Sequence, residues 1–364
     1  MFFYLHIFIL SHLHIETTNP YNMNKIPSRW LFLAAFLVLG TACKKSADDA
    51  ISPQKEKDAS RMAVVDHVQE MRTFIKDISA YARANKPGFL IVSQDGLPLL
   101  TSTGDSTGTP DTAYLNAIDA VGQEEVYYGY NNVDDATTPA ADRNAYLKML
   151  RYAERKGKPA LVTDYCYTTS KVNASYANNF SNGFISYAAT QRELDIISTN
   201  APYNVHAGNI NTLADAKNFL YLINPHTYTS KSQFLTDLKA TNFDVLILDG
   251  FFNDDAAPLT AADVQSLKTK ANGGKRIVLA YVAIGHAEDY RAYWKEEWLT
   301  NPPAWLDIAE DEDWEGNYMV RYWMADWKKI VYGNDTSYIK KFTNAGFDGA
   351  YLDLYDYTYW ETHQ

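Results

Sequence analysis

The sequence predicts an α/β fold consisting of a single (β/α)8 TIM barrel, and three observations support it. Eight short apolar segments recur along the chain, and helical segments separate most of them. Several helical segments end in Gly or Asn, as at 156–157, 272–274 and 344–346, where a left-handed residue closes a helix before a strand. Strand–helix alternation repeated eight times over roughly 280 residues is typical of this barrel.

The predicted elements follow the chain in order. Residues 61–84 carry apolar side chains at spacings of three and four, which predicts an amphipathic helix that Pro87 ends. The predicted strands are 89–93, 117–121, 160–164, 184–188, 218–223, 244–249, 276–282 and 349–354. The last strand finishes near the C-terminus, so the first helix is expected to fill the place of the missing last one. The barrel therefore looks circularly permuted. A doubly wound open sheet is the alternative, but no Gly-rich phosphate loop follows an early strand.

The segment before the barrel is expected to be an export signal and a tether. Residues 23–42 have a short basic start, an apolar run and small residues before Cys43, which resembles a bacterial lipoprotein signal. Residues 1–22 are then a gene-start artefact, 43–60 a flexible tether, and 61–364 the barrel domain. We expect lipidation at Cys43 and an exported protein at the outer membrane or cell surface, touching the membrane only through this anchor. An ordinary signal peptide, with a periplasmic or secreted product, is the alternative.

Composition excludes several classes of function. The net charge is −11, from 33 Lys and Arg against 44 Asp and Glu, which argues against nucleic acid as a partner. Two cysteines exclude a disulfide framework and a four-cysteine zinc site. The eight histidines have no zinc-protease spacing, so we expect no cofactor and no transition metal.

Acidic residues cluster where the predicted strands end, which is where barrel enzymes carry out their chemistry. Two strands share the form Phe-Asp-x4-Asp and end in Asp249 and Asp353. The other strand-end residues are Gln94, Asp95, Glu124, Glu125, Asp164, Tyr165, Asp356 and those of segment 281–288. Two carboxylates on one face suit an acid–base or an acid–nucleophile pair. Helix capping and a Ca²⁺ or Mg²⁺ site are the alternatives.

Aromatic residues make up 14% of the chain, and seven of the eight Trp lie between residues 294 and 360. Many fall in the long segment between the seventh and eighth predicted strands. Flat rings stack on the C–H faces of sugars, so rings beside carboxylates predict a carbohydrate cleft. Core packing between barrel and outer helices is the alternative for each ring.

Several stretches resemble glycoside hydrolase family 114, which contains endo-α-1,4-polygalactosaminidases and related barrel proteins. They are 89–96, 244–249, Tyr322-Trp323 and, most specifically, the Ile-Gly-x-Ala-Glu-Asp-Tyr-Arg segment at 284–291 and the Phe-Asp-Gly-x-Tyr-Leu-Asp strand at 347–353. The resemblance runs from about residue 61 to 364. It implies a TIM barrel that hydrolyses an amino-sugar polymer, so the expected partner is a polysaccharide.

The candidate site residues combine the strand ends with this resemblance. The catalytic candidates are Asp353, Asp249 and, in reserve, Glu288. The candidates for substrate binding are Gln94, Glu125, Asp164, Tyr165, Tyr281, His286, Asp289, Trp323 and Asp356. Family members similar to this chain usually carry Glu where His286 stands. This departure favours a second hypothesis, a non-catalytic surface lipoprotein that binds glycans. A tRNA synthetase relative is disfavoured by the export signal, the charge and the lack of nucleotide motifs.

Overall fold

A computed structural model describes residues 65–198, 202–253, 257–311, 313–355 and 357–363. The expected signal region, the tether with Cys43, and Asp356 lie outside the described residues. Within the described part, no helix combines the length and the apolar character needed to cross a bilayer.

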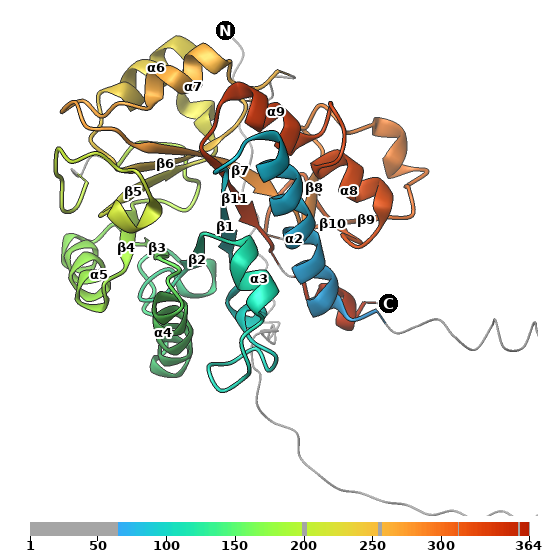
Figure 1. Ribbon diagram of the computed structural model, residues 1–364, viewed down its shortest axis with the longest axis horizontal. Helices are drawn as coiled ribbons and strands as arrows, with labels where there is room; N and C mark the ends of the chain where they lie inside the picture. Colours follow the sequence, from blue (N-terminus) through green and yellow to red (C-terminus); the bar gives the residue numbers. More distant parts are fainter. Residues whose placement is uncertain (1–64, 199–201, 254–256, 312, 356, 364) are drawn as a thin grey trace, which may run out of the picture. The chain divides into compact units, whose positions relative to one another are not determined.

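Eight parallel strands form a nearly closed barrel with helices around it (Figure 1). The sheet order is β4-β3-β2-β1-β11-β7-β6-β5, and a bridge between Ser186 and Asn218 is the one link between the two outer strands among the described residues. The barrel strands are β1 (Leu90–Gln94), β2 (Ala120–Glu124), β3 (Ala160–Tyr165), β4 (Ile185–Ala189), β5 (Phe219–Leu222), β6 (Val245–Asp249), β7 (Ile277–Ala283) and β11 (Gly349–Asp353). The predicted α/β barrel is confirmed.

The helices surround these strands. In the part of the chain that the structure describes, the α-helices are α2 (His67–Asn85), α3 (Thr112–Ala117), α4 (Ala140–Arg155), α5 (Thr169–Asn182), α6 (Lys231–Lys239), α7 (Ala261–Leu267), α8 (Ala325–Val331) and α9 (Tyr338–Ala345). Helix α2 buries Met71, Ile75, Ile78 and Ala82, the stripe that its spacing predicts, and packs against α3 and α9. It therefore precedes β1 and lies between the helices before β2 and β11. That the order arose by circular permutation stays a prediction.

All eight predicted strands exist, and the largest difference concerns the second. It begins at Ala120 instead of residue 117, because α3 continues to Ala117. Asp111 caps this helix by accepting a hydrogen bond from the backbone N–H of Tyr114. The buried apolar residues at the end of α3 therefore belong to a helix, although they continue the apolar run of the strand.

A three-stranded antiparallel sheet and α8 are inserted between β7 and β11, at the right of Figure 1. Its strands are β8 (His286–Glu288), β9 (Leu306–Glu310) and β10 (Asn317–Val320), in the order β8-β10-β9. Trp305 and Trp327 are buried here with ring centroids 5.1 Å apart, and Trp298 lies against Trp305 at the same distance. These rings pack the insertion onto the barrel, so the core-packing alternative holds for Trp305 and Trp327.

Aspartates stabilise the end of the barrel where the strands begin, which we call the base. Three aspartates, each just before a strand, accept a hydrogen bond from a backbone N–H of the neighbouring strand or of the residues that lead into it. Asp119 accepts from Ile91 at 2.7 Å, Asp244 from Lys217 at 2.8 Å and Asp348 from Val278 at 3.0 Å. Each also forms an ion pair with one Lys or Arg: Arg83, Lys270 and Lys268, respectively.

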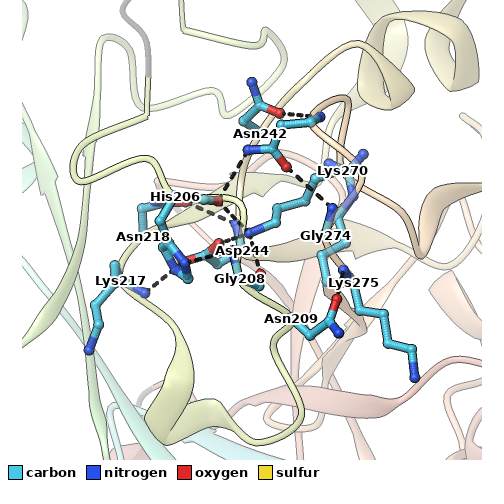
Figure 2. Close-up of polar contacts among 12 residues, drawn as sticks. His206, Gly208, Asn209, Lys217, Asn218, Asn242, Asp244, Lys270, Gly274 and Lys275 are labelled. Carbon is cyan, nitrogen blue, oxygen red and sulfur yellow. Dashed lines mark hydrogen bonds and ion pairs between the residues drawn. The ribbon is translucent and has the colours of Figure 1, made fainter.

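The pair of Asp244 and Lys270 is fully buried, and Figure 2 shows its surroundings. The Lys270 ammonium donates to Asp244 Oδ1 at 2.8 Å and to the carbonyls of His206 and Gly208 at 2.8 and 2.9 Å. Asn218 Oδ1 accepts the backbone N–H of Asp244. The network thus ties the β4–β5 connection to β6, beside the bridge between Ser186 and Asn218 that links β4 to the approach of β5.

Candidate active site

The carboxyl ends of the barrel strands carry the candidate acids. We call this end the mouth, and its acids are Asp95, Glu124, Asp249, Glu288 and Asp353. Asp95 and Glu125 directly follow β1 and β2 with φ of 57° and 58°, a left-handed conformation that is uncommon for residues other than Gly. Backbone strain of this kind is frequent at functional sites.

Asp249 and Glu288 form a buried cluster around Arg291. Arg291 donates from Nη1 to Asp249 Oδ2 at 2.8 Å and from Nε and Nη2 to the two carboxylate oxygens of Glu288 at 2.8 and 3.1 Å. The Tyr290 hydroxyl donates to Glu288 Oε1, and the backbone N–H of Phe251 donates to Asp249 Oδ1. Burial raises the pKa of Asp249 to about 6, although the Arg291 charge opposes this rise. Two carboxylates and one guanidinium leave this cluster with one negative charge when all three are ionised.

Asp353, at the end of β11, lies beside this cluster and is only partly buried. The Tyr281 hydroxyl donates to its Oδ2 at 2.6 Å, and the backbone N–H of Tyr355 donates to its Oδ1. Burial raises the pKa of Asp353, and the nearby charge of Glu288 adds to the rise. Tyr281, Asp249 and Glu288 also line one small cavity of about 10 Å³. The structure therefore gathers the three predicted catalytic acids around Tyr281.

Asp95 and Glu124 complete the mouth, although neither was among the candidates. Both are partly buried, and within the described residues neither forms an ion pair with a Lys or Arg. Amide groups of Gln94 and Gln123 donate to the two oxygens of Asp95 at 3.2 and 2.9 Å. Burial and the charge of Asp353 raise the pKa of Asp95 to about 8. The candidate Gln94 therefore contacts an acid, and its Oε1 accepts a hydrogen bond from the Tyr351 hydroxyl.

A glycine beneath the mouth permits this contact. A Cβ on Gly122 would overlap both Gln94 Oε1 and the Tyr351 hydroxyl. Because Gln94 Oε1 accepts from Tyr351, its Nε2 is left to face Asp95. Gly122 and Tyr351 thus orient the amide that holds Asp95.

Glu125 and Tyr165, two candidates for substrate binding, lie beside Arg192. Arg192 Nη2 lies 2.8 Å from Glu125 Oε1, and its guanidinium stacks 4.0 Å from the centre of the Tyr165 ring. The Tyr165 hydroxyl donates to Glu124 Oε2 at 2.8 Å. Arg192 follows β4 in a segment without any sequence pattern, so no signal could have identified it.

Asp164 holds a loop rather than facing the mouth. It is fully buried and accepts four hydrogen bonds, from the backbone N–H groups of Tyr127 and Tyr128, from Ser175 and from Asn179. These contacts join the loop after β2 to α5. A substrate group would have to displace one of these donors to reach it.

Three further candidates lie in or near the insertion. His286 is 3% exposed, and its ring lies 4.0 Å from that of Tyr355 and against the sulfur of Met319. Burial lowers the pKa of His286 to about 4, so the ring is neutral at physiological pH. Asp289 faces acids of the insertion, Glu310 among them, and its pKa is raised by burial and by these charges. Trp323 is half-buried, with its ring 4.8 Å from that of His67.

Residues 201–363 match the family model for Glycoside-hydrolase family GH114. The uncharacterized protein MJ1477 of Methanocaldococcus jannaschii is 34% identical over 179 residues, 49% of this chain and 49% of its own length. Uncharacterized proteins of Thermotoga maritima and Deinococcus radiodurans are 39% and 38% identical over 125 and 122 residues, each covering 34% of this chain and 36% of the relative. The chain thus matches about half or less of the length of these curated relatives. The part of the barrel that carries Asp249, Glu288 and Asp353 matches glycoside hydrolase family GH114, and the resemblance inferred from the sequence is confirmed.

Proposed function

We propose that the protein is an endo-acting glycoside hydrolase that cleaves an α-linked galactosamine-type polysaccharide at the mouth. The GH114 match supports glycosidase activity in general. The observation that carries the proposal is the gathering of Asp249, Glu288 and Asp353 around Tyr281. Glycosidases need carboxyl groups beside the scissile bond, because the transition state resembles an oxocarbenium ion.

We assign Asp353 as the carboxylate that acts at the anomeric carbon of the sugar. It is more exposed than Asp249 and Glu288, and its two hydrogen bonds, from Tyr281 and Tyr355, favour its ionised form. An ionised Asp353 acts on the anomeric carbon as nucleophile or activates water as base. Asp249 and Glu288, held by Arg291, add one net negative charge beside the positive charge that develops on the sugar.

The acidic mouth also supports an amino sugar as substrate. Asp95, Glu124 and Asp353 lie together without a Lys or Arg partner in the described part of the chain. A protonated amine is attracted to the negative charge of the ionised Asp353 and of the cluster formed by Asp249, Glu288 and Arg291. We further propose that the protein acts at the cell surface, anchored through Cys43.

The alternative is a glycan-binding lipoprotein without catalysis, and His286 is the feature that favours it. A single experiment distinguishes the two functions. Release of reducing ends from polygalactosamine is measured for the wild type, Asp353→Asn and Asp249→Asn, with binding followed by titration calorimetry. We expect release by the wild type and a loss of at least about 100-fold in both variants.

The exposed Asp326→Asn is the matched control, because its side chain is 73% exposed and lies on α8. It should cleave at the wild-type rate. Wild-type binding without release would establish the glycan-binding alternative, and unchanged release by both mouth variants would refute the assignment of the acids.

A further inference from the structure

Glu124 is a mouth carboxyl that the reaction proposed above does not use. It ends β2, is partly exposed, and accepts one hydrogen bond among the described residues, from the Tyr165 hydroxyl at 2.8 Å. No Lys or Arg forms an ion pair with it in the described part of the chain. An acidic side chain in this setting favours its protonated form over its ionised form.

The neighbouring Glu125 lies in a different setting from Glu124. Glu125 is the next residue, but its left-handed backbone turns it toward Arg192, which pairs with it at 2.8 Å. Arg192 is held in turn by Tyr165 and by the carbonyl of Gly129. One acid of the consecutive pair is therefore neutralised, and the other is left to the mouth.

Negative charges on neighbouring elements also raise the pKa of Glu124. Asp95 follows β1 and Asp353 ends β11, and both raise the pKa of Glu124 in addition to its burial. The Tyr165 hydroxyl and the more distant Arg192 charge lower it, but the pKa stays well above its usual range. Tyr221 and Tyr351 also face Glu124 from the barrel interior, as neutral phenols.

The sheet places Glu124 and Asp353 on opposite sides of β1. Gln94 pairs in register with Asp353 on one side and with Gly122 on the other, and Glu124 lies two residues beyond Gly122. Two strand spacings separate the backbones by about 10 Å. Across this gap, the two side chains can reach one glycosidic bond from two sides. Retaining and inverting glycosidases both need two carboxyl groups placed in this way.

We propose that Glu124 is the general acid of the hydrolysis, paired with the carboxylate of Asp353. This inference rests on the proposed hydrolase function. The carboxyl proton of Glu124 passes to the glycosidic oxygen while the bond between that oxygen and the anomeric carbon breaks, and the leaving sugar departs as an alcohol. If the configuration is retained, a carboxylate oxygen of Asp353 bonds to the anomeric carbon, and water then displaces Asp353 from that carbon while its proton returns to Glu124. If the configuration inverts, water attacks the anomeric carbon directly and its proton passes to Asp353, from which solvent returns it to Glu124.

Two substrates test this role. Polygalactosamine has a poor leaving group that needs the proton, whereas the phenolate of a 2,4-dinitrophenyl α-galactosaminide departs without one. Glu124→Gln should lower kcat/KM on the polymer by about 100-fold or more and on the aryl glycoside by less than about tenfold, because kcat/KM reports cleavage of the glycosidic bond and not the later attack of water. The alkaline limb of the wild-type pH profile on the polymer should disappear in the variant. Asp353→Asn should lose activity on both substrates.

Glu154→Gln is the matched control, because this glutamate accepts the backbone N–H of Ala160 at the start of β3, at the base. It should leave both rates unchanged. Wild-type cleavage of the polymer by Glu124→Gln would overturn the inference, as would equal loss on both substrates by a variant with native thermal stability. A wild type inactive on both substrates would instead refute the hydrolase function.

Discussion

Acidic side chains lie at both ends of the barrel, but in opposite settings. At the base, Asp119, Asp244 and Asp348 each pair with one cation and also accept a backbone N–H. At the mouth, Asp95, Glu124 and Asp353 lack such a cation among the described residues, and the pKa of each is raised. Acids at the base therefore stabilise the fold, whereas Asp95 and Glu124 at the mouth cost stability and hold protons.

The largest expected effect concerns the base. Lys270→Ala leaves Asp244 buried without its cation, which should lower the free energy of unfolding by about 3–5 kcal/mol. Urea denaturation measures this loss. Lys329→Ala is the matched control, because its ion pair with Asp326 is exposed and should contribute less than about 1 kcal/mol. A similar loss in both variants would contradict the distinct role of the base.

The second effect concerns Arg291, the cation of the mouth. Arg291→Lys keeps the charge but cannot reach Asp249 and both oxygens of Glu288 as the guanidinium does. We expect kcat on polygalactosamine to fall by about 10–100-fold, with a smaller change in KM, because the acids lose their fixed positions. Kinetics at several pH values measure this, and Arg321→Lys, whose side chain contacts Trp360 and the Ala304 carbonyl, is the control. Unchanged kcat would show that Arg291 only holds the insertion.

The fold was predictable because it depends on local sequence patterns, namely apolar segments and the glycines that end helices. Eight apolar segments and glycine-ended helices follow from local chemistry, and Gly157 and Gly346 do follow α4 and α9 in the left-handed conformation. The prediction at 272–274 is wrong, because α7 already ends at Leu267 and this segment is a turn beyond it. The position of β2 was less predictable, since a buried helix end and a buried strand are alike in composition. The predicted strand therefore starts three residues early, at Ala117, the last residue of α3.

The site was predictable only in part. Asp249, Glu288 and Asp353 were identified because they end strands or lie in family motifs, and the structure brings them together. The sequence cannot say which of two consecutive acids faces the mouth, so Glu125 was preferred to Glu124, whereas the backbone turns Glu125 toward Arg192. Asp164 ends a predicted strand just as Asp249 does, but β3 continues to Tyr165, and Asp164 is held by hydrogen bonds from the loop after β2 and from α5.

The third effect is a dependence of stability on pH at the mouth. The pKa of Asp95 is about 8 in the folded protein and near its ordinary value of 3.8 when unfolded. Between these values the folded state binds the extra proton, so stability is highest below about pH 4 and falls as the pH rises toward 8. Asp95→Asn removes this decrease and should gain about 1–2 kcal/mol at pH 8, since solvent reduces the effect at a partly exposed group.

Denaturation of the wild type and Asp95→Asn at pH 5 and pH 8 measures this difference. Asp105→Asn is the control, because this aspartate lies in a loop after β1, bonded to Thr103 and Thr107. It should show no such gain at pH 8. An equal dependence of stability on pH in the wild type and Asp95→Asn would contradict the view that Asp95 holds a proton at the expense of stability.

The smallest expected effect is on turnover at His286, and it decides between the two functions. His286 is buried against Met319 and Tyr355, so it cannot touch a sugar in this structure. If the mouth acids carry the chemistry, His286→Glu restores the residue of similar family members without adding a catalytic group. Turnover per folded molecule should then change by less than about threefold. A rise of 100-fold would mean that a catalytic carboxylate has been lost at this position, and that binding of glycans without hydrolysis is the function of this chain.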